Sequence, residues 1–179
     1  MKDEKKILGE ERRDLILTWL KERKAPITGG ELATKTNVSR QVIVQDISLL
    51  KARNLPIIAT SQGYLFLHQP SSEQTVQRVI ACSHTPEQTF DELCLIVDHG
   101  VTIKDVIVEH PVYGDLTASI LVSNRKEVEQ FIEKMSETNA PLLSKLTDGI
   151  HLHTLEADSA TKLDAACYSL QKAGYLIEP

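Results

Sequence analysis

Several features are missing from this sequence of 179 residues, and each absence excludes a class of protein. It has three cysteines, Cys82, Cys94 and Cys167, and no C-x-x-C pair. An odd, scattered set argues against a disulfide framework and favours the reducing cytosol. No apolar run approaches the ~20 residues of a membrane-spanning helix. The charged N-terminus is not followed by the apolar segment of a signal peptide. We therefore expect a cytoplasmic protein with no membrane partner.

Glycine is sparse in the second part of the chain. Between residues 71 and 179 no glycine-rich loop of the phosphate-binding kind occurs, since the glycines there are the separate Gly100, Gly114, Gly149 and Gly174. This argues against a nucleotide-binding catalytic domain. The polar, proline-containing stretch of residues 68–73 instead predicts a linker. We expect two domains, residues 1–70 and residues 71–179.

Negative charge is in excess overall, with a net charge of −5, but it is unevenly distributed. Residues 1–70 have 12 lysines and arginines and 8 acidic residues, a net +4. Residues 71–179 have 8 and 17, a net −9. A mildly basic N-terminal domain suits contact with phosphate, and an acidic C-terminal domain argues against coating of nucleic acid by the whole chain.

The segment 28–67 has the pattern of a winged helix-turn-helix. Thr28 and Glu31 form a capping-box pattern that starts a short helix. Asn37 follows where the chain must reverse, and asparagine tolerates the left-handed backbone that such a reversal can require. Ser39 then caps a second helix. Two short strands around residues 61–63 predict the hairpin called the wing, and an amphipathic helix from about Gly9 to Lys24 precedes the motif.

The second helix of this motif has an apolar face and a polar face. Ile43, Ile47 and Leu50 form a buried stripe at i, i+4 and i+7. The other face has no acidic residue and offers glutamines that can bond to base edges, while the helix start offers N–H groups and an arginine to phosphate. The expected DNA contacts are Thr28, Ser39, Arg40, Gln41, Val44, Gln45, Ser48 and, on the wing, Gln62. The alternative is a plain three-helix unit whose polar face is only solvated.

Residues 76–177 predict an α+β domain. Strands are expected at residues 76–83, 101–109, 116–122 and 149–155, helices at 88–99, 123–138 and 158–172, and a short edge strand at 175–177. The order strand-helix-strand-strand-helix-strand is typical of the ferredoxin-like, split βαβ unit with a helix appended. In that topology the first and fourth strands are antiparallel neighbours.

This pairing brings histidines together. His151 and His153 leave one face of the fourth strand, since they are two residues apart. His84 lies just past the end of the first strand, near the start of the fourth, and Glu92 lies beside the apolar stripe of the first helix. Three imidazoles and one carboxylate would suit a divalent transition metal. A His-x-His pair can also be only a polar strand edge, and Cys82, Glu87, Glu109 and His110 are alternative ligands.

Together the two parts resemble the niacin-responsive transcriptional repressor family, which joins a biotin-repressor-like winged helix to a domain named for three histidines. The resemblance runs from about Gly9 to the end of the chain. The helix-turn-helix pattern is moderately specific, whereas the combination of residues 83–87 with Glu92, 108–114 and 149–153 is more so. It identifies the chain as similar to repressors and not to enzymes.

The resemblance implies one divalent metal ion per chain, with His84, Glu92, His151 and His153 carried over by position as its ligands. Nickel or zinc is the expected ion, with iron or manganese as alternatives. It also implies a homodimer that binds operator DNA and represses genes of NAD synthesis or niacin uptake, with nicotinic acid as co-repressor. We expect His110 and Tyr113, in a turn between strands, to contact that ligand.

Three other functions remain open from the sequence. A metal-dependent hydrolase could follow the winged helix, because an open metal position can also activate water. A metal sensor could respond to the ion alone. A winged helix can also bind a protein, in which case tight operator binding would be absent.

Overall fold

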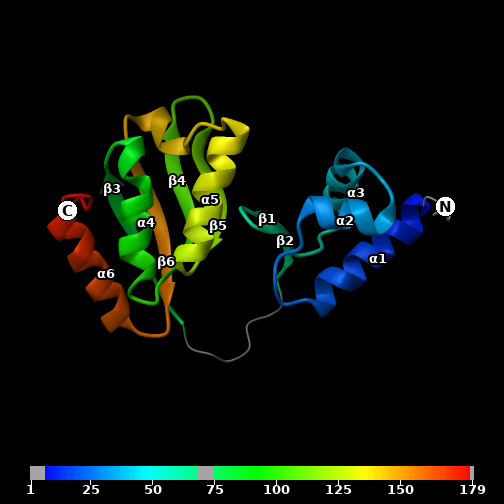
Figure 1. Cartoon of the computed structure of the whole chain (residues 1–179), viewed down its shortest axis with the longest axis horizontal. Helices are drawn as coiled ribbons and strands as arrows, with labels where there is room; N and C mark the ends of the chain where they lie inside the picture. Colours follow the sequence, from blue (N-terminus) through cyan, green and yellow to red (C-terminus); the bar gives the residue numbers. More distant parts are fainter. Residues whose placement is uncertain (1–6, 68–74, 178–179) are drawn as a thin grey trace. The chain divides into compact units, whose positions relative to one another are not determined.

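The computed structural model describes residues 7–67 and 75–177 and divides the chain into two compact units, Met1–Ser71 and Ser72–Pro179 (Figure 1). The predicted linker, residues 68–73, lies outside the described residues. No helix in the described parts of the chain is long and apolar enough to cross a membrane.

The N-terminal unit contains three helices and a two-stranded hairpin. The elements are α1 (Gly9–Glu22), α2 (Gly29–Thr36), α3 (Arg40–Ala52), β1 (Ile57–Thr60) and β2 (Gly63–Phe66). Thr28 caps α2 by accepting the N–H of Glu31, and Ser39 caps α3 by accepting the N–H of Val42. Asn37 between them is left-handed, with φ 51°. The predicted caps and turn are therefore confirmed. The Glu31 carboxylate, however, pairs with Arg23 and Lys35.

The core of this unit lies between α1, α2 and α3. The predicted stripe of α3 is confirmed, since Ile43, Ile47 and Leu50 are all buried. The hairpin is tied to the helices because Ile27, before α2, exchanges two backbone hydrogen bonds with Tyr64 of β2. This contact fixes where the wing begins relative to α2.

The C-terminal unit has the predicted element order. Its elements are β3 (Val76–Ser83), the 3₁₀ turn η1 (Pro86–Gln88), α4 (Thr89–Val97), β4 (Thr102–His110), β5 (Gly114–Val122), α5 (Arg125–Thr138), the 3₁₀ turn η2 (Leu143–Thr147), β6 (Ile150–Ala157) and α6 (Ala160–Ala173). The expected edge strand at residues 175–177 is a single bridge between Cys82 and Leu176.

The strands form one antiparallel sheet in the order β3-β6-β4-β5. The predicted α+β class and the antiparallel pairing of the first and fourth strands are confirmed. In the ferredoxin-like order the first and third strands are internal and the fourth and second lie at the edges, whereas here both pairs of strands have exchanged places. The exchange places β6 inside the sheet, where it pairs on both sides.

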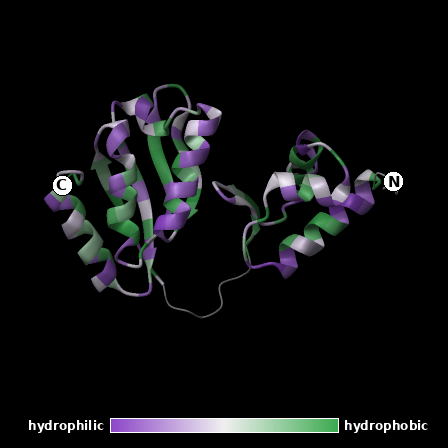
Figure 2. Ribbon diagram, in the orientation of Figure 1, coloured by the Kyte–Doolittle hydropathy of each residue, from purple (hydrophilic) through white to green (hydrophobic). Residues whose placement is uncertain are grey.

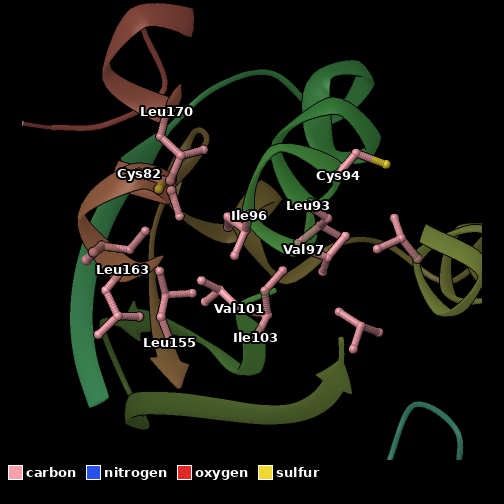
Figure 3. Packing of buried hydrophobic residues seen from close by; sticks show 14 of the residues in the cluster. Cys82, Leu93, Cys94, Ile96, Val97, Val101, Ile103, Leu155, Leu163 and Leu170 are labelled. Carbon is pink, nitrogen blue, oxygen red and sulfur yellow. The ribbon is translucent and has the colours of Figure 1, made fainter. Parts of the chain in front are cut away.

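The three helices of this unit bury one face of the sheet. Helix α4 contacts both α5 and α6, and Figure 2 shows it as mainly hydrophobic while α5 is mostly hydrophilic. Figure 3 shows Leu163 of α6 and Ile96 of α4 beside the sheet residues Leu155 and Ile103, all of which are buried. The buried face of β6 packs on this core at Leu155, and the same face carries His153 and His151 nearer the start of the strand.

Candidate metal centre and DNA-binding face

The three histidines and the glutamate expected from the sequence converge in the structure. Glu92 of α4 lies at the middle, and its carboxylate oxygens are 2.7 Å from Nε2 of His84, 3.2 Å from Nε2 of His151 and 3.5 Å from Nε2 of His153. All four side chains are buried. Three imidazole nitrogens and one carboxylate thus face a common point.

Strand register and one glycine explain this convergence. Cys82 of β3 pairs with His151 of β6, so His84, two residues past the pair, comes to the start of β6. Gly149, just before β6, has φ 96° and packs so closely on His84 that a Cβ atom would collide with the His84 carbonyl oxygen. Only glycine suits both the backbone conformation and this approach.

A backbone carbonyl orients each imidazole ring. Nδ1 of His84 lies 2.8 Å from the Thr85 carbonyl oxygen. Nδ1 of His151 lies 2.9 Å from the Gly149 carbonyl oxygen, and Nδ1 of His153 lies 2.6 Å from the Asp105 carbonyl oxygen. Asp105 lies in an irregular part of β4, where the pairing register shifts against both β5 and β6. Such irregularities commonly redirect groups next to a functional site.

With Nδ1 of each ring bonded to a carbonyl oxygen, the Nε2 atoms that face Glu92 carry no proton to donate. A carbonyl oxygen can only accept, so each Nδ1 must carry the ring proton, and a neutral imidazole then presents a lone pair at Nε2. Three lone pairs would face the Glu92 carboxylate, which also only accepts. Nε2 of His153 in fact has no hydrogen-bond partner among the described residues. The arrangement requires added protons or a cation, and a carbonyl-anchored Nδ1 is the usual setting of a metal-binding histidine.

The pKa values follow the same geometry. Burial opposes the charged form of Glu92, but the charge of His153 and the hydrogen bonds with His151 and His84 outweigh burial and hold the pKa of Glu92 well below the ordinary value. Burial likewise opposes protonation of His84 and His153, yet the Glu92 carboxylate raises the pKa of both. Without a metal, imidazolium is the charge that balances Glu92.

Among the alternative ligands, the structure brings Cys82 to the cluster. The ligand atoms of Cys82, Glu92 and His151 all lie within 4.8 Å of one another. Burial, and then the Glu92 charge, raise the pKa of the Cys82 thiol, which favours its neutral form. Glu87 and Glu109 are exposed. The nitrogen, oxygen and sulfur donors of this cluster fit a borderline divalent transition metal.

A cavity of about 180 Å³ adjoins the cluster. His84, Glu92, His151 and His153 form part of its lining, and helix α5 and the segment before η2 contribute apolar side chains. Thr89, which was not among the residues predicted from the sequence, also lines this cavity. Its spacing of three residues from Glu92 on α4 was the available signal, because i and i+3 share a helix face.

His110 and Tyr113 lie elsewhere, at the turn between β4 and β5. Nδ1 of His110 accepts the backbone N–H groups of Val112 and Tyr113 at 3.2 and 3.3 Å, and Tyr113 is 75% exposed. Neither residue lines the cavity beside the cluster. Contact of these two residues with a small ligand stays a prediction.

The residues expected to meet DNA lie on the N-terminal unit. Seven are exposed, namely Thr28, Ser39, Arg40, Gln41, Val44, Gln45 and Ser48, and Gln62 on the hairpin is half-buried. The Ser48 hydroxyl donates to the Val44 carbonyl, and the Thr28 hydroxyl accepts the Glu31 N–H. These two hydroxyl groups therefore also serve their own helices.

A buried ion pair that was not predicted from the sequence links helix α3 to α1. Arg12 of α1 contacts both carboxylate oxygens of Asp46, at 2.6 and 3.2 Å, and Arg13 adds a contact of 3.2 Å. Arg12 and Asp46 are both buried. The signal was the place of Asp46 beside the apolar stripe of α3, where a solvated carboxylate would not lie.

Comparisons with known proteins agree with both units. Residues 12–65 match an HTH domain and residues 77–179 match the 3H domain. The transcription repressor NadR of Bacillus subtilis is 62% identical over 179 residues, which covers 99% of each chain. The probable transcription repressor NiaR of Thermotoga maritima is 40% identical over 173 residues, 97% of each chain. A helix-turn-helix followed by a 3H domain with its buried histidines, and similarity along the whole length, show that this chain belongs to the NadR/NiaR-type repressor family.

Proposed function

We propose that this protein is a DNA-binding transcription repressor of genes of NAD synthesis or niacin uptake, with nicotinic acid as co-repressor. The observation that carries the proposal is the joining, in one chain, of an exposed α3 face to a buried cluster of three histidines and Glu92. The relatives that match along the whole chain are named transcription repressors, which supports this reading.

In the proposed complex α3 enters the major groove. Gln41, Val44, Gln45 and Ser48 would meet base edges, and Arg40 with the free N–H groups at the helix start would meet phosphate. Thr28, Ser39 and Gln62 flank this face. Because residues 1–70 have a net charge of only +4, one copy would bind DNA with low non-specific affinity. A homodimer that reaches two half-sites about 34 Å apart would supply the missing affinity.

In the regulatory domain His84, Glu92, His151 and His153 would hold one divalent metal ion. Bound there, the ion would supply the positive charge that the buried carboxylate lacks. The imidazole-rich donor set suits nickel or zinc first, and iron or manganese less well.

The decisive experiment measures operator affinity by fluorescence anisotropy, with and without nicotinic acid and with and without a chelator. Repression by a metal-supported co-repressor predicts tight binding only with nicotinic acid and metal together. Tight binding with metal alone would support the metal-sensor alternative, and no tight binding in any arm would support the protein-binding alternative. Hydrolysis of pyridine amides or esters by the purified protein would support the hydrolase.

A His151→Ala variant tests the link between the cluster and DNA. It is expected to lose both bound metal and the response of operator affinity to nicotinic acid. His99→Ala is the matched control, because His99 lies outside the cluster with Nε2 2.8 Å from the Ser169 hydroxyl. A metal-free His151→Ala protein that still responded to nicotinic acid would contradict the proposal.

A further inference from the structure

Cys82 has no role in the proposed function, yet it lies at the buried cluster. It is directly opposite His151 in the pairing of β3 with β6, and residues paired in this way project from the same face of a sheet. The sulfur of Cys82, a Glu92 carboxylate oxygen and a His151 ring nitrogen all lie within 4.8 Å of one another. Cys82 is fully buried, with an exposed fraction of 0%. Its thiol is therefore within reach of an ion bound between Glu92 and His151.

The surroundings of Cys82 differ from those of an ordinary core cysteine. Cys82 and Cys94 both pack in the core of the C-terminal unit. Among the described residues, however, only Cys82 also belongs to a set of three possible metal ligands. A neutral thiol is a weak hydrogen-bond donor, so a buried carboxylate and an imidazole gain little from it as a neighbour. The sulfur gains a clear purpose if an ion binds between them.

The cluster also has an atom that calls for a cation. Nε2 of His153 lies 3.5 Å from a Glu92 oxygen, is buried, and has no hydrogen-bond partner in the part of the chain that the structure describes. Buried polar atoms nearly always have a partner, so an exception requires an explanation such as an ion. Because Nδ1 of this ring carries the proton, Nε2 can only accept a hydrogen bond or coordinate.

Charge balance favours a second anionic ligand. Before any co-repressor binds, a divalent ion held by neutral imidazoles and the single Glu92 carboxylate would leave one excess positive charge among buried side chains. Burial of an unpaired charge is costly. A thiolate at Cys82 would cancel this charge. Its proton would pass to solvent when the ion binds, because a thiol that coordinates a metal ion is deprotonated.

We propose that Cys82 is a further ligand of the metal centre and that its sulfur determines which ion the centre selects. Sulfur is a soft donor that favours zinc, whereas manganese prefers oxygen donors. The inference rests on the proposed function only in taking the buried cluster as a metal site. It predicts that exchange of the sulfur for an oxygen changes the choice of ion and does not merely weaken metal binding.

X-ray absorption spectroscopy of the full-length protein loaded with zinc tests the ligand directly. The spectrum should contain a zinc–sulfur distance of about 2.3 Å beside zinc–nitrogen distances of about 2.0–2.1 Å. Protein loaded with cobalt should show sulfur-to-cobalt charge-transfer absorption in the near ultraviolet. Wild-type protein that binds zinc through nitrogen and oxygen atoms alone would overturn the proposal, and this result requires no variant.

Two variants test the residue. Cys82→Ser should lose the zinc–sulfur distance and the charge-transfer absorption. Cys94→Ser is the matched control, because it removes another buried thiol of the same unit, and it should keep both signals. In competition between zinc and manganese, Cys82→Ser should lower the preference for zinc at least about tenfold. A purely structural role would weaken the binding of both ions alike, and an unchanged preference would overturn the proposal.

The effect of nicotinate on operator affinity is measured separately. If that effect occurs in a wild-type protein without a zinc–sulfur bond, the role of Cys82 is refuted and the proposed function is kept. If the zinc–sulfur bond is present but operator affinity responds to neither nicotinate nor metal, the proposed function is refuted and Cys82 is kept as a ligand.

Discussion

At the scale of single residues, the hydrogen bonds around each imidazole carry most of the functional information. The sequence predicted the meeting of His84, Glu92, His151 and His153, because strand pairing and alternation determine it. It could not predict the carbonyl of Asp105 beside His153, since that contact depends on an irregularity in β4 that no local pattern reveals. The position of Thr89 and the cavity beside the cluster likewise depend on how α4 and α5 pack.

The pKa directions predict how stability depends on pH. In the metal-free protein His84 and His153 have raised pKa values, so their protonation stabilises the fold below the ordinary histidine pKa, and this contribution is lost as pH rises through the raised values. The lowered pKa of Glu92 acts in the opposite sense. Its contribution is present above the ordinary carboxyl pKa and is lost only in acid.

Metal binding needs neutral imidazoles and so gains as pH rises. Between about pH 6 and about pH 8.5 the Tm of chelated protein should therefore fall while that of metal-loaded protein holds or rises. Scanning calorimetry across this range checks the widening gap. Parallel curves for the two forms would contradict it.

Gly149 provides a second test at this scale. Gly149→Ala is expected to lower metal affinity at least about tenfold, because the new Cβ would push β6 away from His84. Gly114→Ala is the control, since Gly114 also has a positive φ, of 71°, but has no atom within 4 Å of its ideal Cβ. The control should lose about 1 kcal/mol of stability from backbone strain and keep its metal. Equal metal loss in both variants would count against a specific role of Gly149.

At the scale of elements, the sequence predicted the helices and strands well where caps and alternation determine them. β3 was predicted at residues 76–83 and is Val76–Ser83. The α4 helix was expected to begin at residue 88, but Pro86–Gln88 form a 3₁₀ turn and the helix starts at Thr89. The exchanged places of the first and fourth strands were not predictable, because both strand orders have the same succession of elements along the chain.

The ion pair behind α3 should matter to the whole N-terminal unit. Asp46→Ala leaves Arg12 buried without its partner, and breaking a buried pair costs about 3–5 kcal/mol. Asp14→Ala, at an exposed position of α1, should cost less than about 0.5 kcal/mol. Denaturant titration followed by the fluorescence of Trp19, the single tryptophan, reports this unit. Similar midpoints for both variants would argue against the pair.

The exposed face of α3 should determine which DNA sequence the protein prefers. If Gln45 contacts a base edge, Gln45→Ala should weaken operator binding by about 1–3 kcal/mol and leave binding to unrelated DNA unchanged. Thr18→Ala on α1 serves as control, because its exposed hydroxyl donates to the Asp14 carbonyl of its own helix. Anisotropy titrations with both DNA sequences separate the two effects. Equal loss on both sequences would assign Gln45 to the phosphate backbone instead.

At the scale of the whole molecule, the change in net charge along the chain coincides with the boundary between the two units. The part with a net charge of +4 has the helix-turn-helix, and the part with −9 has the histidine centre. The polar stretch at residues 68–73 and the uneven distribution of charge together predicted this division. In the proposed homodimer, the way in which one unit affects the other would depend on how two copies assemble, which no local sequence pattern reveals.

The residues of the cluster are far apart in the sequence, and this separation bears on how long the protein survives before it is degraded. Glu92 and His151 are 59 residues apart, so an ion bound to both closes a long loop, as a disulfide would. Closing a loop of this length removes unfolded-state entropy equivalent to on the order of 4 kcal/mol. Chains synthesised while the metal is scarce would unfold more often and would be degraded sooner by proteases. The supply of the ion would then govern how many repressor molecules persist, in addition to whether each one can respond.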